Sequence, residues 1–184
     1  MAFTWITLKR LSNNKYIKNM YFWAIFVPIA AKALSLVKNP LELILFGESI
    51  SIELSLPFSW SAFFCSAVFF SVALLLFNLF CPKIILENST FSSYLNDGKS
   101  LAQLNRYARE VGAEEINITI LKARTSSQES LDYEAQGKFW NIHEHAESYN
   151  KKYKFIISIL YVLGFLVMAF VFFQNIIYVF EAAF

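Results

Sequence analysis

Three long apolar stretches dominate the pattern of hydrophobic and polar positions along this chain. Residues 155–180 and residues 60–80 contain no charged side chain. As helices they would be ~39 Å and ~32 Å long at about 1.5 Å per residue, against a hydrocarbon core of ~30 Å. The third stretch, residues 20–37, contains Pro28 and Lys32. The pattern predicts an α-helical integral membrane protein with three transmembrane helices.

The charges between these stretches predict an orientation. Lysines and arginines gather in residues 1–19, which hold no acid, and in residues 81–154, whereas residues 39–59 hold glutamates and no base. Basic loops stay in the cytoplasm, so we expect a cytoplasmic N-terminus (1–19), an outer loop (38–59), a cytoplasmic segment (81–154) and an outer tail (181–184). The expected protein crosses a membrane three times.

An alternative interpretation treats residues 1–33 as a signal peptide. It has a basic start, an apolar middle and a small-x-small site at Ala31-Lys32-Ala33, and cleavage there would leave two spans. The basic start extends over residues 1–19, which is long for a signal peptide. We therefore prefer the three-span interpretation.

Short elements are expected between the spans. In the outer loop, apolar residues alternate at positions 50, 52, 54 and 56, which predicts a strand in a short outer β-ribbon. Residues 41–46 could extend this ribbon or form an interfacial helix. In the mostly helical cytoplasmic segment, the pattern predicts a helix over residues 101–111, N-capped by Ser100 and ended by Gly112. Alternating isoleucines at 116, 118 and 120 predict a short strand.

From about residue 130 the pattern becomes helical and continues into the last span. An apolar seam with heptad-like spacing begins at Ala135, and its five later residues form a candidate partner-contact surface: Phe139, Ile142, Ala146, Tyr149 and Tyr153. A continuous stalk of this kind would pack against its own chain, a second copy or a protein partner.

The candidate chemistry is sparse. Lys32 is a candidate functional charge within the membrane, although a lysine in the second half of a span can also snorkel to the surface. His143, His145 and Glu147 lack the spacing of a zinc site, so we expect a solvated helix face there. Catalytic and nucleotide-binding motifs are missing from the sequence, and the net charge is only +2. We therefore expect a protein without enzymatic activity, metal, cofactor or direct nucleic-acid binding.

Three short stretches carry a resemblance to a known class of proteins. Residues 80–85 (FCPKII) at the end of the second apolar stretch are followed by residues 91–100 (FSSYLNDGKS) and 104–107 (LNRY). These resemble small bacterial and phage membrane proteins of anti-phage defence, namely retron transmembrane effectors and superinfection-exclusion proteins of the SieB type. The third span departs from the pattern of the retron effectors, which end with a soluble part.

The resemblance implies an abortive-infection effector. A cytoplasmic protein partner, such as a reverse transcriptase–nucleic acid complex, would hold it silent, and release would let it disrupt the inner membrane as a toxin. Two alternatives remain: an immunity protein of the colicin type that binds a pore-former in the membrane, and a scaffold subunit of a membrane complex. Self-association is compatible with each of them.

Overall fold

The computed structural model describes residues 3–35, 41–45, 48–52, 59–117, 119, 121 and 128–183. The chain divides into two units. The first unit consists of Met1–Ser12 and Leu75–Ser158, and the second unit consists of Asn13–Leu74 and Ile159–Phe184. Two long helices, α3 (Trp60–Phe80) and α9 (Lys151–Ala183), contribute residues to both units.

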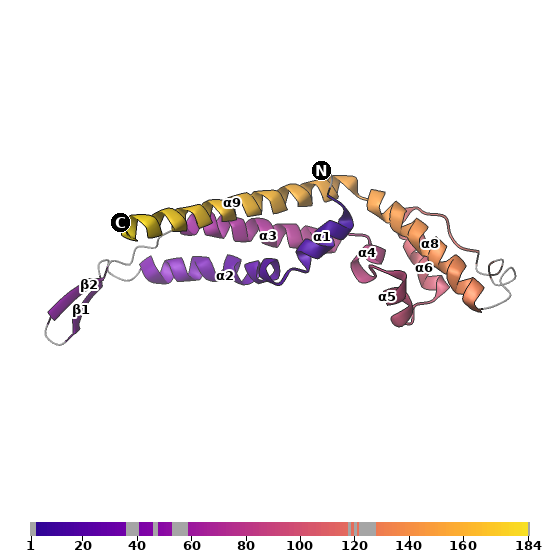
Figure 1. Ribbon diagram of the computed structural model, residues 1–184, viewed down its shortest axis with the longest axis horizontal. Coiled ribbons are helices and arrows are strands. Elements are labelled where there is room, and N and C mark those ends of the chain that lie inside the picture. Colours follow the sequence, from indigo (N-terminus) through magenta and orange to yellow (C-terminus); the bar gives the residue numbers. More distant parts are fainter. Residues whose placement is uncertain are drawn as a thin grey trace. The chain divides into compact units, whose positions relative to one another are not determined.

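In the second unit, helix α2 (Lys15–Ser35) runs beside α3, and α3 runs beside α9 (Figure 1). The ring of Trp23 on α2 meets that of Phe63 on α3 edge to face, with the ring centroids 5.6 Å apart. Between α3 and α9, the hydroxyl of Ser66 donates a buried hydrogen bond of 3.0 Å to the carbonyl of Gly164. Aromatic packing and polar contacts therefore join these helices, as is common in membrane bundles.

The missing side chain of Gly164 makes room for a ring. A Cβ atom built at this position would lie 3.0 Å from two carbons of the Phe70 ring. That ring is almost fully buried, and it packs edge to face on Phe165 at a centroid distance of 5.0 Å. The glycine thus fixes how closely α3 and α9 approach.

Both α3 and α9 are long and apolar enough to cross a membrane, and only 33% and 28% of their apolar windows are buried. A core helix of a soluble protein would bury such a window instead. Helix α2 begins at Lys15, five residues earlier than predicted, and includes Lys15, Lys18 and Lys32. Among the described residues only α3 and α9 meet the criteria for a span, so the third span stays a prediction.

Two strands lie in the loop between α2 and α3. Strand β1 (Leu41–Leu45) pairs antiparallel with β2 (Glu48–Ile52), in a register that sets Leu41 opposite Ile52 and Leu45 opposite Glu48. For residues 41–46 the sequence allowed either an extension of the ribbon or an interfacial helix. Residues 41–45 form a strand. Residues 53–56 of the predicted alternation lie outside the described part of the chain, and the position of the pair outside the membrane stays a prediction.

The first unit is built from short helices around one longer helix (Figure 1). Helix α8 (Gln128–Ser148) packs against α4 (Lys83–Glu87), α5 (Phe91–Asn96) and α6 (Leu101–Val111), and α1 (Trp5–Ser12) packs against α4. The rings of Phe91 and Tyr94 lie 5.7 and 5.6 Å from that of Phe139, between centroids, and form an aromatic core. The predicted bounds of α6 are confirmed, with Ser100 at the N-cap position and Gly112 in the left-handed conformation at φ 71°, but the Ser100 side chain makes no capping hydrogen bond.

The strand predicted over residues 116–120 is wrong where the structure describes it. Residues 113–117 have no regular secondary structure, while 118 and 120 lie outside the described residues. The side chain of Asn105 on α6 satisfies Ile116 instead of a neighbouring strand: its amide donates to the Ile116 carbonyl at 2.8 Å and its oxygen accepts from the Ile116 amide at 2.7 Å. Ile116 itself is buried in this loop.

The predicted continuous stalk is also wrong. Helix α8 ends at Ser148, and α9 begins at Lys151. Between them Asn150 has a positive φ of 51°, which a right-handed helix cannot contain. The hydrophobic pattern runs through this break because it records burial and carries no information about one left-handed residue.

Replacing Gly164 by leucine should separate α3 from α9. The new side chain must displace the buried Phe70 ring, and overpacking of this kind costs about 1–3 kcal/mol. We expect a lower denaturation midpoint for the protein in detergent micelles. Gly137→Ala is the matched control, because a Cβ atom there meets nothing within 4 Å and alanine favours a helix by about 1 kcal/mol. Equal stability of Gly164→Leu and the parent would contradict this account of the contact.

Candidate functional site

The ends of several helices meet at a break that we call the elbow, formed by Tyr149 and Asn150. The Asn150 side-chain amide donates to the carbonyl of Phe80 at 3.1 Å and so caps the end of α3. The ring of Tyr153, the third residue of α9, stacks on that of Phe80, with the centroids 3.6 Å apart. Asparagine suits this position because it tolerates the left-handed conformation and carries a donor.

The N-terminus of helix α1 is bound to the end of α8, next to the elbow. The carboxylate of Glu147, near the end of α8, accepts from the backbone amides of Trp5 at 2.8 Å and Ile6 at 3.1 Å. The hydroxyl of Thr4 accepts from the amide of Thr7 at 3.1 Å. The first three amides of a helix have no partner within it, so these contacts satisfy all three of α1, and the negative charge favours the positive end of the helix dipole.

Two side chains of α1 add to this attachment. The indole of Trp5, which is 0% exposed, donates to the carbonyl of Tyr149 at 2.9 Å and packs against Phe77. The ammonium of Lys9 donates to the carbonyl of Ile85 at 2.6 Å and to the hydroxyl of Ser89 at 2.7 Å. Burial lowers the pKa of Lys9, although the hydrogen bonds are those that a charged lysine makes near the end of a helix.

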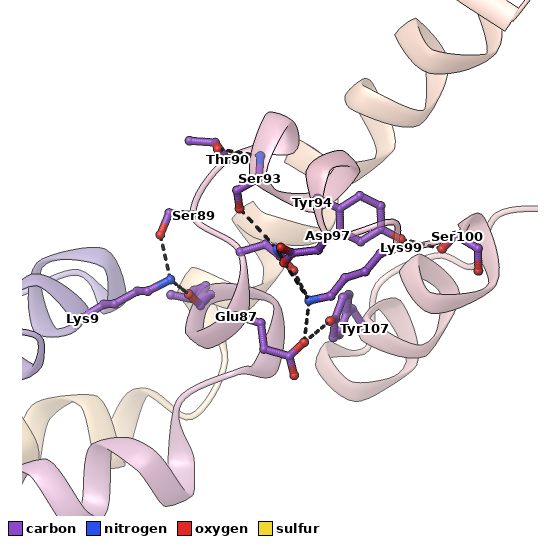
Figure 2. A network of polar contacts seen from close by, with 12 residues as sticks. Lys9, Glu87, Ser89, Thr90, Ser93, Tyr94, Asp97, Lys99, Ser100 and Tyr107 are labelled. Atoms are coloured by element: carbon purple, nitrogen blue, oxygen red, sulfur yellow. Dashed lines mark hydrogen bonds and ion pairs between the residues drawn. The ribbon is translucent and has the colours of Figure 1, made fainter.

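A second polar cluster, the Lys99 network, ties α4 and α5 to α6 (Figure 2). The Lys99 ammonium donates to Glu87 at 2.7 Å and to the buried Asn88 at 2.6 Å, and it lies 3.6 Å from Asp97. The hydroxyl of Tyr107 donates to the same oxygen of Glu87 at 2.6 Å. Each polar group of this partly buried cluster thus has a partner, as a stable network requires.

The groups of the Lys99 network shift one another's pKa values. Hydrogen bonds from Lys99 and Tyr107 hold the pKa of Glu87 below its ordinary value. Burial would lower the pKa of Lys99, but the hydrogen bonds with Glu87 and Tyr107 outweigh it and leave that pKa raised. Burial, together with the bond to Glu87, raises the pKa of Tyr107. At neutral pH the cluster is an ion pair with a protonated phenol, which suits a structural role.

His143 differs from the solvated helix face that the sequence predicted. It is only 4% exposed, its Nε2 atom has no hydrogen-bond partner, and its ring lies against those of Phe139 and Trp140. The expectation is wrong because His143 is four residues from Phe139 and three from Ala146, on the buried side of α8. Burial lowers the pKa of His143; nearby Glu147 opposes this effect, and Lys9 adds to it.

The remaining reactive groups near the elbow are poorly placed for chemistry. Burial raises the pKa of the Cys81 thiol to about 12, so the thiol stays protonated and is a weak nucleophile. His145 is exposed, and its Nδ1 atom contacts the carbonyl of Asn141. Within the described residues, His, Cys, Asp and Glu side chains form no group of three that could hold a metal ion. The arrangement binds helix ends to one another.

The structure brings only part of the predicted seam together. Phe139, Ile142 and Ala146 are fully buried within the first unit, so their candidate role in partner contact would require this unit to open. Tyr149 lies in the elbow, and Tyr153 lies beyond it on α9 with a partly exposed ring. Lys32 lies in the last turn of α2 with an exposed side chain.

Sequence reasoning missed the contacts that hold α1. Thr4 is recognisable as an N-cap, but Glu147 is 142 residues away from Trp5, and its role leaves no local signal. A tryptophan and a lysine spaced i, i+4 in a short basic helix are compatible with many environments. Asn150 could have been suspected, because asparagine between two helical patterns is a common left-handed residue.

No family model, curated protein or solved structure matches this chain.

Asn150→Ala should destabilise the elbow more than Asn150→Gly. In alanine the left-handed conformation costs about 1–2 kcal/mol, and the hydrogen bond to the Phe80 carbonyl is lost as well. Glycine loses only this hydrogen bond. We expect a loss of about 2 kcal/mol for alanine and under about 1 kcal/mol for glycine, measured by chemical denaturation in micelles. Equal losses would show that the backbone conformation at Asn150 is unimportant.

Stability should fall as the pH is lowered through the ordinary pKa of histidine. Below about 6.5 the unfolded chain binds a proton at His143, while the folded protein resists it, so the proton favours unfolding. The stabilising effect of neutral His143 is therefore present above this pH and lost below it. We expect the melting temperature to drop between pH 7.5 and 5.5, and less so in His143→Leu. His145→Gln, at the exposed histidine, should retain the full drop; an unchanged drop in His143→Leu would contradict the assignment.

Proposed function

We propose that this chain is a non-enzymatic effector of an anti-phage system in a bacterial inner membrane, controlled by a cytoplasmic protein partner. In this proposal α2, α3 and α9 cross the membrane. The N-terminus and residues 81–154 face the cytoplasm, while the β1–β2 pair and the end of α9 face outward. The resemblance of residues 80–107 to defence proteins supports the class of function.

The single observation that carries the membrane assignment is the exposure of large apolar side chains all along α9. They include Phe155, Ile159, Phe165, Phe170, Phe173 and Phe180. Each exposed square ångström of such surface is unfavourable in water by about 25 cal/mol, and lipid removes this cost. Helix α9 would be ~50 Å long at about 1.5 Å per residue, so it must tilt in a core of ~30 Å or extend beyond it.

The basic residues at the start of α9 support the orientation. Lys151 and Lys152 are exposed, and Lys154 donates to the carbonyl of Glu147. They precede the first exposed phenylalanine, Phe155, in the order that is usual on the cytoplasmic side of a span. The elbow would then lie at the inner surface of the membrane, where a cytoplasmic partner can reach it.

Expression of this chain without any partner tests its proposed function as an effector. We expect induction of the chain in bacterial cells to depolarise the membrane, followed within the hour by arrest of growth, with a potential-sensitive dye as the readout. Leu166→Lys should abolish the effect, because a lysine on the exposed face near the middle of α9 costs about 2.5–3.5 kcal/mol on insertion. Tyr133→Lys, at an exposed position of α8, is the matched control and should retain it.

Other outcomes of this experiment favour other functions. Normal growth with an intact potential, in cells that contain the protein in their membranes, would overturn the effector. If those cells also resist one pore-forming bacteriocin, the protein is an immunity protein.

A further inference from the structure

Helix α1 is attached to the first unit as a separate piece. It has eight residues, from Trp5 to Ser12, and the chain leaves helical geometry at Asn13 and Asn14 before α2 begins. The boundary between the two units falls between Ser12 and Asn13. Isolated helices shorter than about 12–15 residues are marginal in water, so α1 depends on the surface that it covers.

That surface presents a matched set of partners for one end of a helix. The Glu147 carboxylate accepts from the first backbone amides, the Tyr149 carbonyl accepts from an indole, and the Ile85 carbonyl and Ser89 hydroxyl accept from an ammonium. We call these four residues, with Phe77 under the indole, the strap surface. The polar contacts of Glu147 are to backbone amides, which every helix has.

The strap surface requires few particular side chains of the helix that it binds. Trp5 and Leu8 are 0% exposed, and Lys9 reaches across to α4. An amphipathic helix with an aromatic donor at its first position, a leucine three residues later and a lysine four residues later could make the same contacts. Helix-in-groove recognition uses anchors at this spacing.

We propose that α1 is a detachable strap, and that the strap surface is the docking site for an amphipathic helix of the cytoplasmic partner, which takes the place of α1. The proposal rests on the proposed function for the existence of that partner. The charge of the surface favours it, because Glu147 presents an acid where the N-terminus of a docking helix is positive. The Lys154 ammonium lies 3.8 Å from this carboxylate and remains beside it when α1 leaves. Exchange would release α1 from the first unit.

Hydrogen exchange in the full chain tests whether α1 detaches by itself. In lipid nanodiscs we expect the amides of residues 5–8 to exchange in a faster phase than those of residues 139–146 in α8. Glu147→Ala should accelerate residues 5–8 by about tenfold, since a lost cap is worth on the order of 1.4 kcal/mol, and should leave α8 unchanged. Glu144→Ala, at an exposed carboxylate of the same helix, is the control.

The α8 amides show in the same experiment whether the variant is folded. If residues 5–8 and 139–146 exchange together in the parent protein, α1 is an integral part of the first unit, and the strap is overturned. The same conclusion follows if Glu147→Ala leaves the exchange of residues 5–8 unchanged.

A peptide tests the docking site. Residues 3–12 (FTWITLKRLS) carry every α1 contact, and a fluorescent copy would be added to the full chain with its own α1 weakened by Trp5→Ala and Leu8→Ala. We expect saturable binding below millimolar concentration, at least tenfold weaker binding when Glu147→Ala is added, and at least tenfold weaker binding of the peptide with its tryptophan replaced by alanine. In the intact protein the chain itself holds α1 near its site at an effective concentration in the millimolar range. We therefore take millimolar as the upper limit for binding of the free peptide.

Absence of binding up to that concentration would overturn the docking site. The membrane-potential experiment is independent of this result, because it uses no peptide and requires no exchange. A depolarising protein that fails to bind the peptide would therefore keep its proposed function and lose only this site.

Discussion

The backbone groups at helix ends must find partners, and this constraint organises the first unit. Four helix ends are satisfied by side chains from distant parts of the chain: Glu147 caps the start of α1, Asn150 the end of α3, Glu110 the start of α4, and Lys9 the carbonyl of Ile85 in α4. Short helices have a large share of such ends. Without these contacts, several unpaired polar groups would lie in a partly buried junction, at about 1–3 kcal/mol each.

The need of helix ends for partners explains why the attachment of α1 depends on the elbow. Asn150 turns the chain between α8 and α9, and the turn sets Glu147 and the carbonyl of Tyr149 on the same side as the amides and indole of α1. In a continuous helix, the Tyr149 carbonyl would be bonded within that helix and unavailable to Trp5. The break is therefore what makes a binding surface out of the end of α8.

Much of the fold follows from local pattern, and the rest depends on contacts that sequence does not display. The bounds of α3, the apolar run within α9 and the ends of α6 could be predicted, because apolar runs, a serine at the N-cap position and Gly112 act locally. The break at Asn150 and the loop held by Asn105 could not, because each depends on one side-chain amide that binds backbone groups 70 and 11 residues away, and hydrophobic periodicity reports only burial. The burial of His143 could have been suspected, since it lies four residues from Phe139 and three from Ala146 on the same face of α8.

The distance between Trp5 and Glu147 along the chain has a consequence for biosynthesis. The residues of α1 are translated first, but the carboxylate that binds their amides follows 142 residues later. Domains assemble during synthesis only as their parts emerge. Until Glu147 has been synthesised, the segment of α1 lacks the acceptor of its first amides and is open to chaperones. The attachment of α1 thus reports that synthesis has passed residue 147, and ribosomes that stall before that residue leave a product with a loose basic N-terminal segment.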